Sequence, residues 1–347
     1  MTNTTQKSCK RLFLHIGTHK TGSTALQTLL AKNDRLLVDN NILFPNSGRI
    51  STYSGHHNIA WELNEDPRFN KENGTISELC LELAASDCNL AIISSEDFEY
   101  LHQKPDQLYF LKTALENVGY EIDVIVFFRD QARYAYSLYQ ELVKHGLDRT
   151  FYSFSKEVFR TGAFVMNGNW RFCFSYELII QTFAKVFGSN HVHCEAYSNP
   201  IHIQFLLVCG LSEISLELSD NTSNKALPLE KIVALLRINE FTKGMSEQDA
   251  SKVRNAIFSS QIPEHHNLSC TLNNPVFIIL HYVRFRATRT WIRTHYNTKI
   301  TMTIIKDITS SIKCSPIFLW KRRRRHIIDS LVYEAFDVLK NDVESQK

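Results

Sequence analysis

The chain has 347 residues, enough for a large core, and its 44% hydrophobic and 22% charged residues are typical of a soluble globular protein, while the formal net charge of +3 by itself says little. No apolar run approaches the roughly 20 residues that a membrane-spanning helix needs, which argues against a helical membrane protein. The eight cysteines are scattered without a CxxC pair or a His-rich metal spacing, so we expect reduced thiols in a cytoplasmic protein and no metal site.

Short apolar runs alternate with helical patterns along the chain, which favours an α/β protein with a central parallel sheet flanked by helices. The first strand is predicted to begin by Leu12, which leaves no room for a signal peptide. Buried strands are predicted over residues 12–16, 90–94, 122–128 and 191–197. Helices are predicted over residues 23–33, 131–145, 175–188, 227–241 and 326–339.

The segment GTHKTGST, residues 17–24, joins the first predicted strand to the first predicted helix. A turn in this position offers backbone N–H groups and the positive end of a helix to an anion. Lys20, Ser23 and Thr24 add a cation and two hydroxyl donors. A Walker A loop would carry lysine directly after its second glycine. Here Ser23 follows Gly22 and the lysine lies inside the loop, which disfavours a nucleoside-triphosphate site.

The string KTGSTAL at residues 20–26 resembles the phosphosulfate loop of sulfotransferases that use 3′-phosphoadenosine-5′-phosphosulfate (PAPS), often written KTGTT[AS]L. The longer string HIGTHKTGSTALQ, residues 15–27, is similar to bacterial sulfotransferase-domain proteins, which are related to carbohydrate sulfotransferases. The resemblance implies a P-loop-like sulfotransferase fold. It also implies that the donor is bound by the loop residues Thr18, His19, Lys20, Thr21, Gly22, Ser23 and Thr24.

A second motif follows the strand predicted over residues 122–128. Arg129 comes directly after that strand, and Ser137 lies eight residues later on the next predicted helix. In the family, arginine and serine at this spacing hold the 3′-phosphate of the donor, so the resemblance implies this role for Arg129 and Ser137. A guanidinium group offers a planar fork to phosphate oxygens and a hydroxyl adds one donor. The family usually has proline where Gln131 stands.

The resemblance implies in-line displacement at sulfur, with Lys20 stabilising charge on the bridging oxygen and a glycan or glycolipid hydroxyl as acceptor. Such an acceptor needs a general base. In related carbohydrate sulfotransferases the base lies some thirty residues after the loop lysine, which points here to His56 and His57. Glu96 is a third candidate, because α/β sites gather at the carboxyl ends of strands. All three stay open, with the histidines preferred.

The resemblance covers about residues 11–245, and we expect a sulfotransferase domain over residues 11–265 with a helical, basic extension over residues 266–347. Between residues 275 and 326, twelve Lys or Arg stand against one acid, Asp307. This excess favours an anionic partner, and three interpretations stay open: a solvated basic face, peripheral contact with the inner face of the membrane, or contact with an acidic polysaccharide. A specific nucleic-acid site is not expected.

Two other functions stay open. A P-loop kinase-like phosphotransferase would need a nucleoside triphosphate with Mg²⁺, and the position of Lys20 speaks against it. A non-catalytic membrane- or glycan-binding protein with a vestigial loop is disfavoured because Lys20, Arg129 and Ser137 are all present. The acceptor itself is not identified by the sequence, since loops and C-terminal additions build acceptor pockets.

Overall fold

The computed structural model describes residues 9–50, 54–166, 170–218, 227–260, 280–281, 283–296, 329–332 and 335. The chain divides into two compact units, one made of residues 1–130, 175–222 and 287–301 and the other of residues 131–174, 223–286 and 302–347. The domain boundary expected after residue 265 lies outside the described residues, as does most of the helix expected over residues 326–339.

The first unit is built on a five-stranded parallel sheet with the strand order β2-β3-β1-β4-β7. Its strands are β1 (Lys10–His15), β2 (Ile42–Leu43), β3 (Leu90–Ser94), β4 (Tyr120–Phe128) and β7 (Val192–Ala196). Strand β1 lies at the centre, where Leu14 is in register with Ile93 on one side and Val124 on the other. The expected α/β architecture with a central parallel sheet is therefore confirmed.

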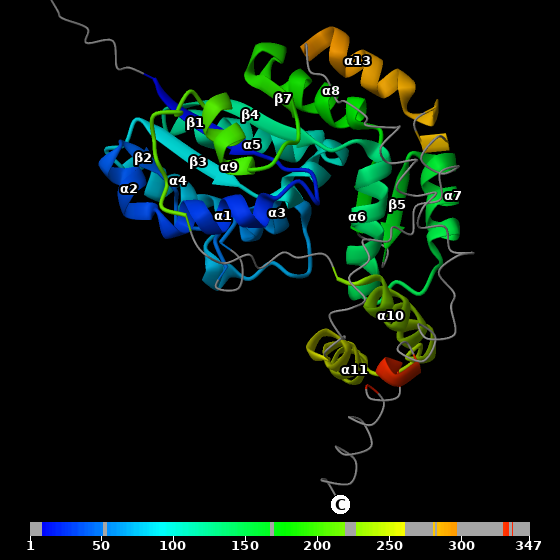
Figure 1. Cartoon of the computed structure of the whole chain (residues 1–347). Coiled ribbons are helices and arrows are strands. Elements are labelled where there is room, and N and C mark those ends of the chain that lie inside the picture. Colours follow the sequence, from blue (N-terminus) through cyan, green and yellow to red (C-terminus); the bar gives the residue numbers. More distant parts are fainter. Residues whose placement is uncertain are drawn as a thin grey trace, which may run out of the picture. The chain divides into compact units, whose positions relative to one another are not determined.

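Helices cover both faces of this sheet (Figure 1). They are α1 (Ser23–Lys32), α2 (Asp34–Asp39), α3 (His57–Asn64), α4 (Ile76–Ala85), α5 (Pro105–Asn117), α8 (Tyr176–Phe187) and α9 (Ile201–Val208), with the 3₁₀ helices η1 (Lys71–Asn73), η2 (Glu96–Gln103) and η3 (Ser189–His191). On one face Leu26 and Phe205 pack with Phe13 and Ile125, so that α1 and α9 close one half of the core. Helices α5 and α8 contact β4 from the other face.

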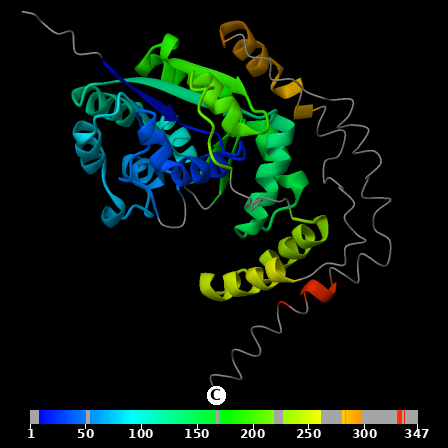
Figure 2. The same cartoon turned by 60° about the vertical axis from the view of Figure 1, so that its left-hand side comes forward.

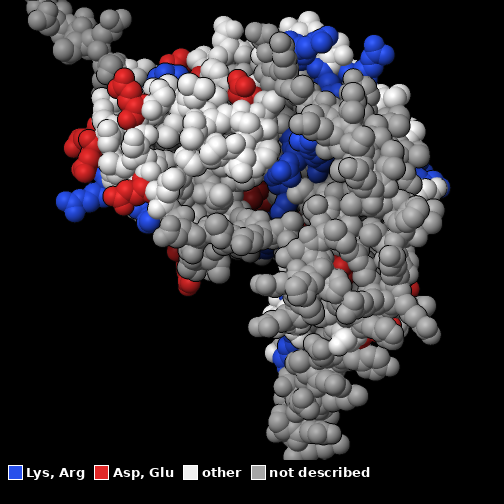
Figure 3. Space-filling model, in the orientation of Figure 1, with Lys and Arg blue, Asp and Glu red and all other residues white. Residues whose placement is uncertain are grey.

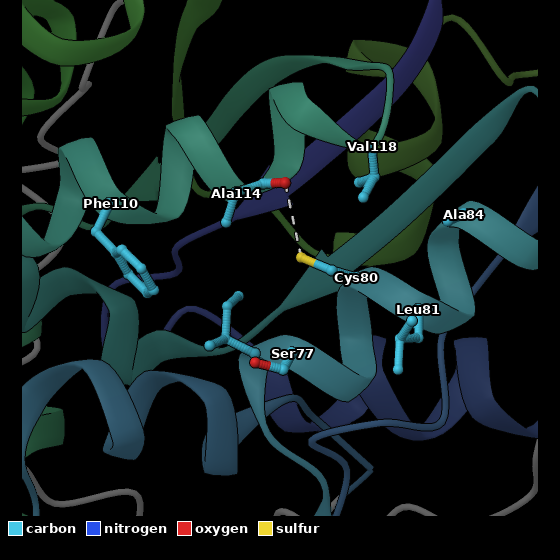
Figure 4. Close-up of a pocket in the computed structure, with 8 residues that line it drawn as sticks. Ser77, Cys80, Leu81, Ala84, Phe110, Ala114 and Val118 are labelled. Atoms are coloured by element: carbon cyan, nitrogen blue, oxygen red, sulfur yellow. Dashed lines mark hydrogen bonds between the residues drawn. The ribbon is translucent and has the colours of Figure 1, made fainter.

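Two apolar surfaces of the first unit lie outside its core. Helix α9 bears no charged residue and exposes Ile203 and Leu207, and the surface over it is white in Figure 3. A shallow groove between α4 and α5 is lined by Cys80, Leu81 and Phe110, among others (Figure 4). Neither surface includes a residue of the predicted site.

The second unit contains α6 (Gln131–Lys144), α7 (Phe151–Thr161), an antiparallel pair β5 (Ala163–Met166) and β6 (Trp170–Cys173), α10 (Leu229–Phe241) and α11 (Glu247–Ser259). Aromatic rings of Tyr139, Phe154 and Phe164 pack in its core. Asn239 of α10 donates to the carbonyl oxygens of Val143 and Leu147 at the end of α6. Helices α10 and α11 contact each other and are yellow in Figure 2.

Helix α13 (Arg286–Tyr296) is the part of the basic stretch that the structure describes as a regular helix. It buries Thr288 and Ile292, while Arg286 and Arg293 are exposed. Across the described parts of the chain, no helix combines the length and the apolar character that crossing a membrane requires.

Candidate functional site

The turn between β1 and α1 has an unusual backbone. Gly17 and Gly22 adopt positive φ angles of 63° and 83°, and Lys20 between them has φ 66° although it is not a glycine. A left-handed conformation at such a residue costs about 1–2 kcal/mol and is concentrated at functional sites. Left-handed residues in such a turn gather backbone N–H groups into a concave surface that binds anions. The turn predicted from the sequence is therefore shaped for an anion.

Two threonines of the turn hold its shape. Thr18 Oγ1 donates to the carbonyl oxygen of Phe127 at 2.9 Å, and Thr21 Oγ1 donates to the carbonyl oxygen of Thr18 at 2.6 Å. Both side chains are buried. Their hydroxyl hydrogens are therefore used within the protein, and Thr18 and Thr21 can offer a ligand only their backbone N–H groups.

Helix α1 begins at Ser23 without a side-chain cap and without an acidic residue in its first turn. Ser23 is 3% exposed, and its Oγ atom lies 3.2 Å from the position that a Cβ atom at Gly17 would take. Within the described residues this hydroxyl has no hydrogen-bond partner. Thr24, by contrast, is exposed. An uncapped helix N-terminus beside a buried, unsatisfied hydroxyl is suited to an anionic group.

Arg129 follows β4 and lies beside the same turn. Its guanidinium carbon is 5.0 Å from the ring centre of Tyr197, and its carbonyl oxygen accepts a hydrogen bond from Tyr176. Tyr197 also lies 3.5 Å from the Cβ position of Gly22. One aromatic ring therefore links the arginine to the turn. Ser137 lies half-buried on α6, in the second unit, so its pairing with Arg129 rests on the sequence spacing.

The two neighbouring histidines at the start of α3 have different surroundings. His56 is fully buried, and its Nε2 atom lies 2.9 Å from the carbonyl oxygen of Pro45 while its Nδ1 atom accepts from the backbone N–H of Ser94 at 3.1 Å. Burial, followed by the charge of Arg49, lowers the pKa of His56 to about 3. Both ring nitrogens contact backbone groups, so His56 joins the segment at Pro45 to the end of β3 as a neutral residue.

His57 faces carboxylates instead. Its Nδ1 atom lies 3.1 Å from Oδ2 of Asp97 and 2.9 Å from Oγ of Ser95, and its Nε2 atom lies 4.0 Å from Oε2 of Glu96. Burial acts to lower the pKa of His57, but the hydrogen bond to Asp97 and the charge of Glu96 outweigh it and raise the pKa. His57 thus has the environment of a proton-transfer group.

Glu96 follows the carboxyl end of β3 and connects α1 to α3. Its Oε2 atom accepts a hydrogen bond of 3.0 Å from Nε2 of Gln27, which also donates to Oγ of Ser94 at 3.2 Å. The side chain is 16% exposed. The structure therefore brings together two of the three candidate bases, Glu96 and His57, whereas both ring nitrogens of His56 contact backbone groups.

Three residues of this site were missed by the sequence analysis: Asp97, Gln27 and Tyr197. Asp97 is buried beside His57, and its Oδ1 atom also lies 3.9 Å from Nε2 of His19 in the turn. The string SSED, residues 94–97, displays two adjacent acids after a strand, and this was the available signal. The contacts of Asp97 join residues far apart in the chain and have no local pattern.

His15, which ends β1 below the turn, is fully buried, and its Nδ1 atom lies 2.8 Å from Oγ of Ser94. Burial lowers its pKa to about 4, so it is neutral near pH 7. Among the residues that the structure describes, no group of three or more His, Cys, Asp or Glu side chains is arranged to hold a metal ion.

Comparison with protein-family models, with curated proteins and with solved structures gives no match for this chain.

Proposed function

We propose that this protein is a sulfotransferase that transfers the sulfuryl group of PAPS to a hydroxyl group of a glycan or glycolipid. The observation that carries the proposal is the turn between β1 and α1. There the left-handed Lys20, the buried hydroxyl of Ser23 and the uncapped N-terminus of α1 all belong to one strand-to-helix junction. This combination fits the phosphosulfate end of PAPS, in agreement with the resemblance of the loop sequence.

A second cationic residue, Arg129, favours a donor with two anionic groups, such as PAPS, over a donor with one. PAPS carries a phosphosulfate on its 5′ side and a phosphate on its 3′ side. Arg129, linked to the turn through Tyr197, is suited to the 3′-phosphate because guanidinium groups bind phosphate oxygens in pairs. We assign Ser137 to the same phosphate from its spacing to Arg129. Thr18, His19, Thr21, Gly22, Ser23 and Thr24 belong to the proposed donor loop, with Lys20 at its centre.

In the proposed reaction the acceptor oxygen forms a bond to sulfur while the bond from sulfur to the bridging oxygen breaks. Lys20 stabilises the negative charge that develops on the bridging oxygen, a type of interaction worth several kcal/mol. Adenosine 3′,5′-bisphosphate is the leaving group. His57 takes the acceptor proton on Nε2, since both nitrogens of His56 are already bound to backbone groups. Glu96 lies on the Nε2 side of His57 and is the alternative proton acceptor.

Thermal unfolding with two ligands tests the proposal. Adenosine 3′,5′-bisphosphate at about 100 times its dissociation constant should stabilise the protein by about 2.7 kcal/mol, whereas ATP with Mg²⁺ should have little effect. Lys20→Gln, which removes the charge and retains an L-residue at the same φ, should weaken the stabilisation. Stabilisation by ATP with Mg²⁺ alone would favour the kinase-like phosphotransferase. Stabilisation by neither ligand would favour the non-catalytic binding protein.

For the basic stretch we propose peripheral contact with an anionic membrane surface on the cytoplasmic side. Helix α13 supports this because it exposes Arg286 and Arg293 and buries Thr288 and Ile292. Co-sedimentation with phosphatidylserine vesicles, compared with neutral vesicles, tests it. The double variant Arg286→Gln, Arg293→Gln should reduce binding to the anionic vesicles, and unchanged binding would count against α13 as the contact.

A further inference from the structure

The carboxylate of Asp97 lies between the proposed base and the proposed donor loop. Its Oδ2 atom is 3.1 Å from Nδ1 of His57 and accepts a hydrogen bond of 2.7 Å from Nε1 of Trp61. Its Oδ1 atom is 3.9 Å from Nε2 of His19, the residue directly before Lys20. The backbone N–H of Asp97 donates to Oγ of Ser95. One buried carboxylate therefore contacts the base and a neighbour of the loop lysine.

The protonation of this pair follows from its geometry. Burial acts to raise the pKa of Asp97, but the hydrogen bond and charge of His57 outweigh it, and the pKa falls to about 2. Asp97 is therefore ionised at neutral pH and can only accept. Two oxygens face Nδ1 of His57: Oδ2 of Asp97 at 3.1 Å and Oγ of Ser95 at 2.9 Å. An unprotonated Nδ1 would place its lone pair against the lone pairs of the ionised carboxylate, whereas a protonated Nδ1 can donate to both oxygens, so we place the hydrogen on Nδ1. When His57 is neutral, its lone pair is on Nε2.

Other charged groups also surround this histidine. Those that act on His57 or are acted on by it are Asp97 and Glu96 of η2, Arg68 beyond the end of α3, His19 of the loop and the adjacent His56. The two carboxylates outweigh the cationic groups and burial, because the pKa of His57 is raised. The imidazolium form is thus stabilised where the proposed reaction produces it.

We infer that Asp97 is a positioning residue, which holds His57 in the Nδ1–H tautomer so that the lone pair of its neutral ring is on Nε2, the atom proposed to take the acceptor proton. The inference rests on the proposed function, which supplies the acceptor and the donor. As the oxygen–sulfur bond forms, the acceptor proton moves to Nε2 and His57 becomes an imidazolium ion whose Nδ1–H still donates to Asp97. The contact between Asp97 and His19 keeps His57 near the proposed donor loop.

The tautomer can be measured directly in the full-length protein. Two-bond ¹H–¹⁵N correlation spectra of protein labelled with ¹⁵N-histidine distinguish Nδ1–H from Nε2–H, and His57→Gln assigns the signal. We expect neutral His57 to be protonated at Nδ1. In Asp97→Ala the carboxylate that accepts from Nδ1–H is removed and Oγ of Ser95 can donate to Nδ1 instead, so the signal should move to the Nε2–H form and the pKa of His57 should fall. Glu65→Gln is the matched control, since Glu65 caps α3 and forms an exposed ion pair with Lys104.

Thermal shift with adenosine 3′,5′-bisphosphate on the same samples separates this inference from the proposed function. Stabilisation of the wild type with neutral His57 in the Nε2–H form would retain the donor site and overturn the role of Asp97. An Nδ1–H tautomer without stabilisation by the bisphosphate would retain the Asp97–His57 pair and overturn the sulfotransferase. An unchanged tautomer in folded Asp97→Ala would also overturn the inference. The wild-type spectrum decides even if the variant does not fold.

Discussion

Gly17 packs directly against Glu96. A Cβ atom added at Gly17 would lie 2.8 Å from Cβ and 2.9 Å from Cα of Glu96, distances that real side chains do not adopt. The proposed donor loop and the residue that follows β3 are therefore in contact through a position where only glycine fits. This contact fixes the distance between the loop and the carboxylate side of the proposed site.

Gly17→Ala should consequently displace the loop. We expect a loss of about 2–3 kcal/mol in the free energy of unfolding, because the substitution adds both an overlap and a methyl group at φ 63°. Stabilisation by adenosine 3′,5′-bisphosphate should also be lost. Gly210→Ala is the matched control, since Gly210 has φ 71° with nothing within 4 Å of its Cβ position. Equal effects of the two substitutions on ligand binding would contradict the role of the Gly17 contact.

The left-handed conformation of Lys20 is predicted to cost stability, while its ammonium group is predicted to contribute to donor binding. Lys20→Gly removes the left-handed strain and adds the entropy cost of a glycine, so the free energy of unfolding should stay within about 1 kcal/mol of the wild type. Loss of the ammonium group should weaken the binding of adenosine 3′,5′-bisphosphate about tenfold or more. Urea unfolding and calorimetric titration measure the two effects. Lys20→Arg, with the charge and the strain retained, is the control, and wild-type affinity in Lys20→Gly would refute the assignment.

Substitution of His56 should affect the stability of the fold, whereas substitution of His57 should affect the proposed transfer reaction. His56→Ala leaves the carbonyl oxygen of Pro45 and the N–H of Ser94 without their buried partner, and should lower the free energy of unfolding by about 2–4 kcal/mol. His57→Gln should leave the fold and donor binding intact and lower transfer activity about 10²–10⁴-fold. Thermal unfolding of both variants is the first measurement. The prediction fails if His57→Gln is the more destabilised protein.

Arg129 is predicted to recognise the 3′-phosphate. Arg129→Ala should reduce the preference for adenosine 3′,5′-bisphosphate over adenosine 5′-monophosphate about tenfold or more, since a charge-assisted hydrogen bond contributes about 1.5–3 kcal/mol. Ser137→Ala should reduce it less. The monophosphate serves as the internal control, because it lacks the group that both residues are proposed to bind. Equal losses of affinity for the two nucleotides would place Arg129 elsewhere in the site.

The carboxylate of Asp123 is predicted to make the stability of the fold depend on pH, independently of the proposed donor site. Arg11, His191 and His193 contact its carboxylate, and although burial acts to raise the pKa of Asp123, their hydrogen bonds lower it far below the usual 3.8. Stability from this group is therefore present above pH 3.8 and lost as the pH falls through the lower pKa of the folded state. This carboxylate contributes to the pH range in which the fold is stable.

Asp123→Asn should lower the free energy of unfolding by about 1–3 kcal/mol at pH 7 and make stability less sensitive to acid below pH 4. Binding of adenosine 3′,5′-bisphosphate should not change, since Asp123 is in register with Phe13, before the turn begins. Unfolding by urea across this pH range is the measurement. A variant with the same acid sensitivity as the wild type would show that Asp123 does not carry this effect.

Much of the sheet was predictable because strands β1, β3 and β4 are largely buried and rich in apolar residues. The bounds expected for β3 match those observed, and β1, β4 and β7 differ from expectation by no more than two residues at either end. Strand β2, only two residues long, was missed since its pairing with β3 rather than any local pattern defines it. Helices α4 and α5 were missed as well, although Thr75 and Glu78 form a capping box at the start of α4.

The sequence by itself predicted the turn that we propose as the donor loop, because a strand, a turn with two glycines and a helix are set by neighbours in the chain. Tertiary structure alone decided which of the two histidines lies beside carboxylates. His56 precedes α3 with the non-helical angles φ −81° and ψ 47° and turns to the backbone of β3, whereas His57 begins the helix and turns to the carboxylates of η2. The partner of His57 is Asp97, 40 residues further along the chain, and only the packing of η2 against α3 brings them together.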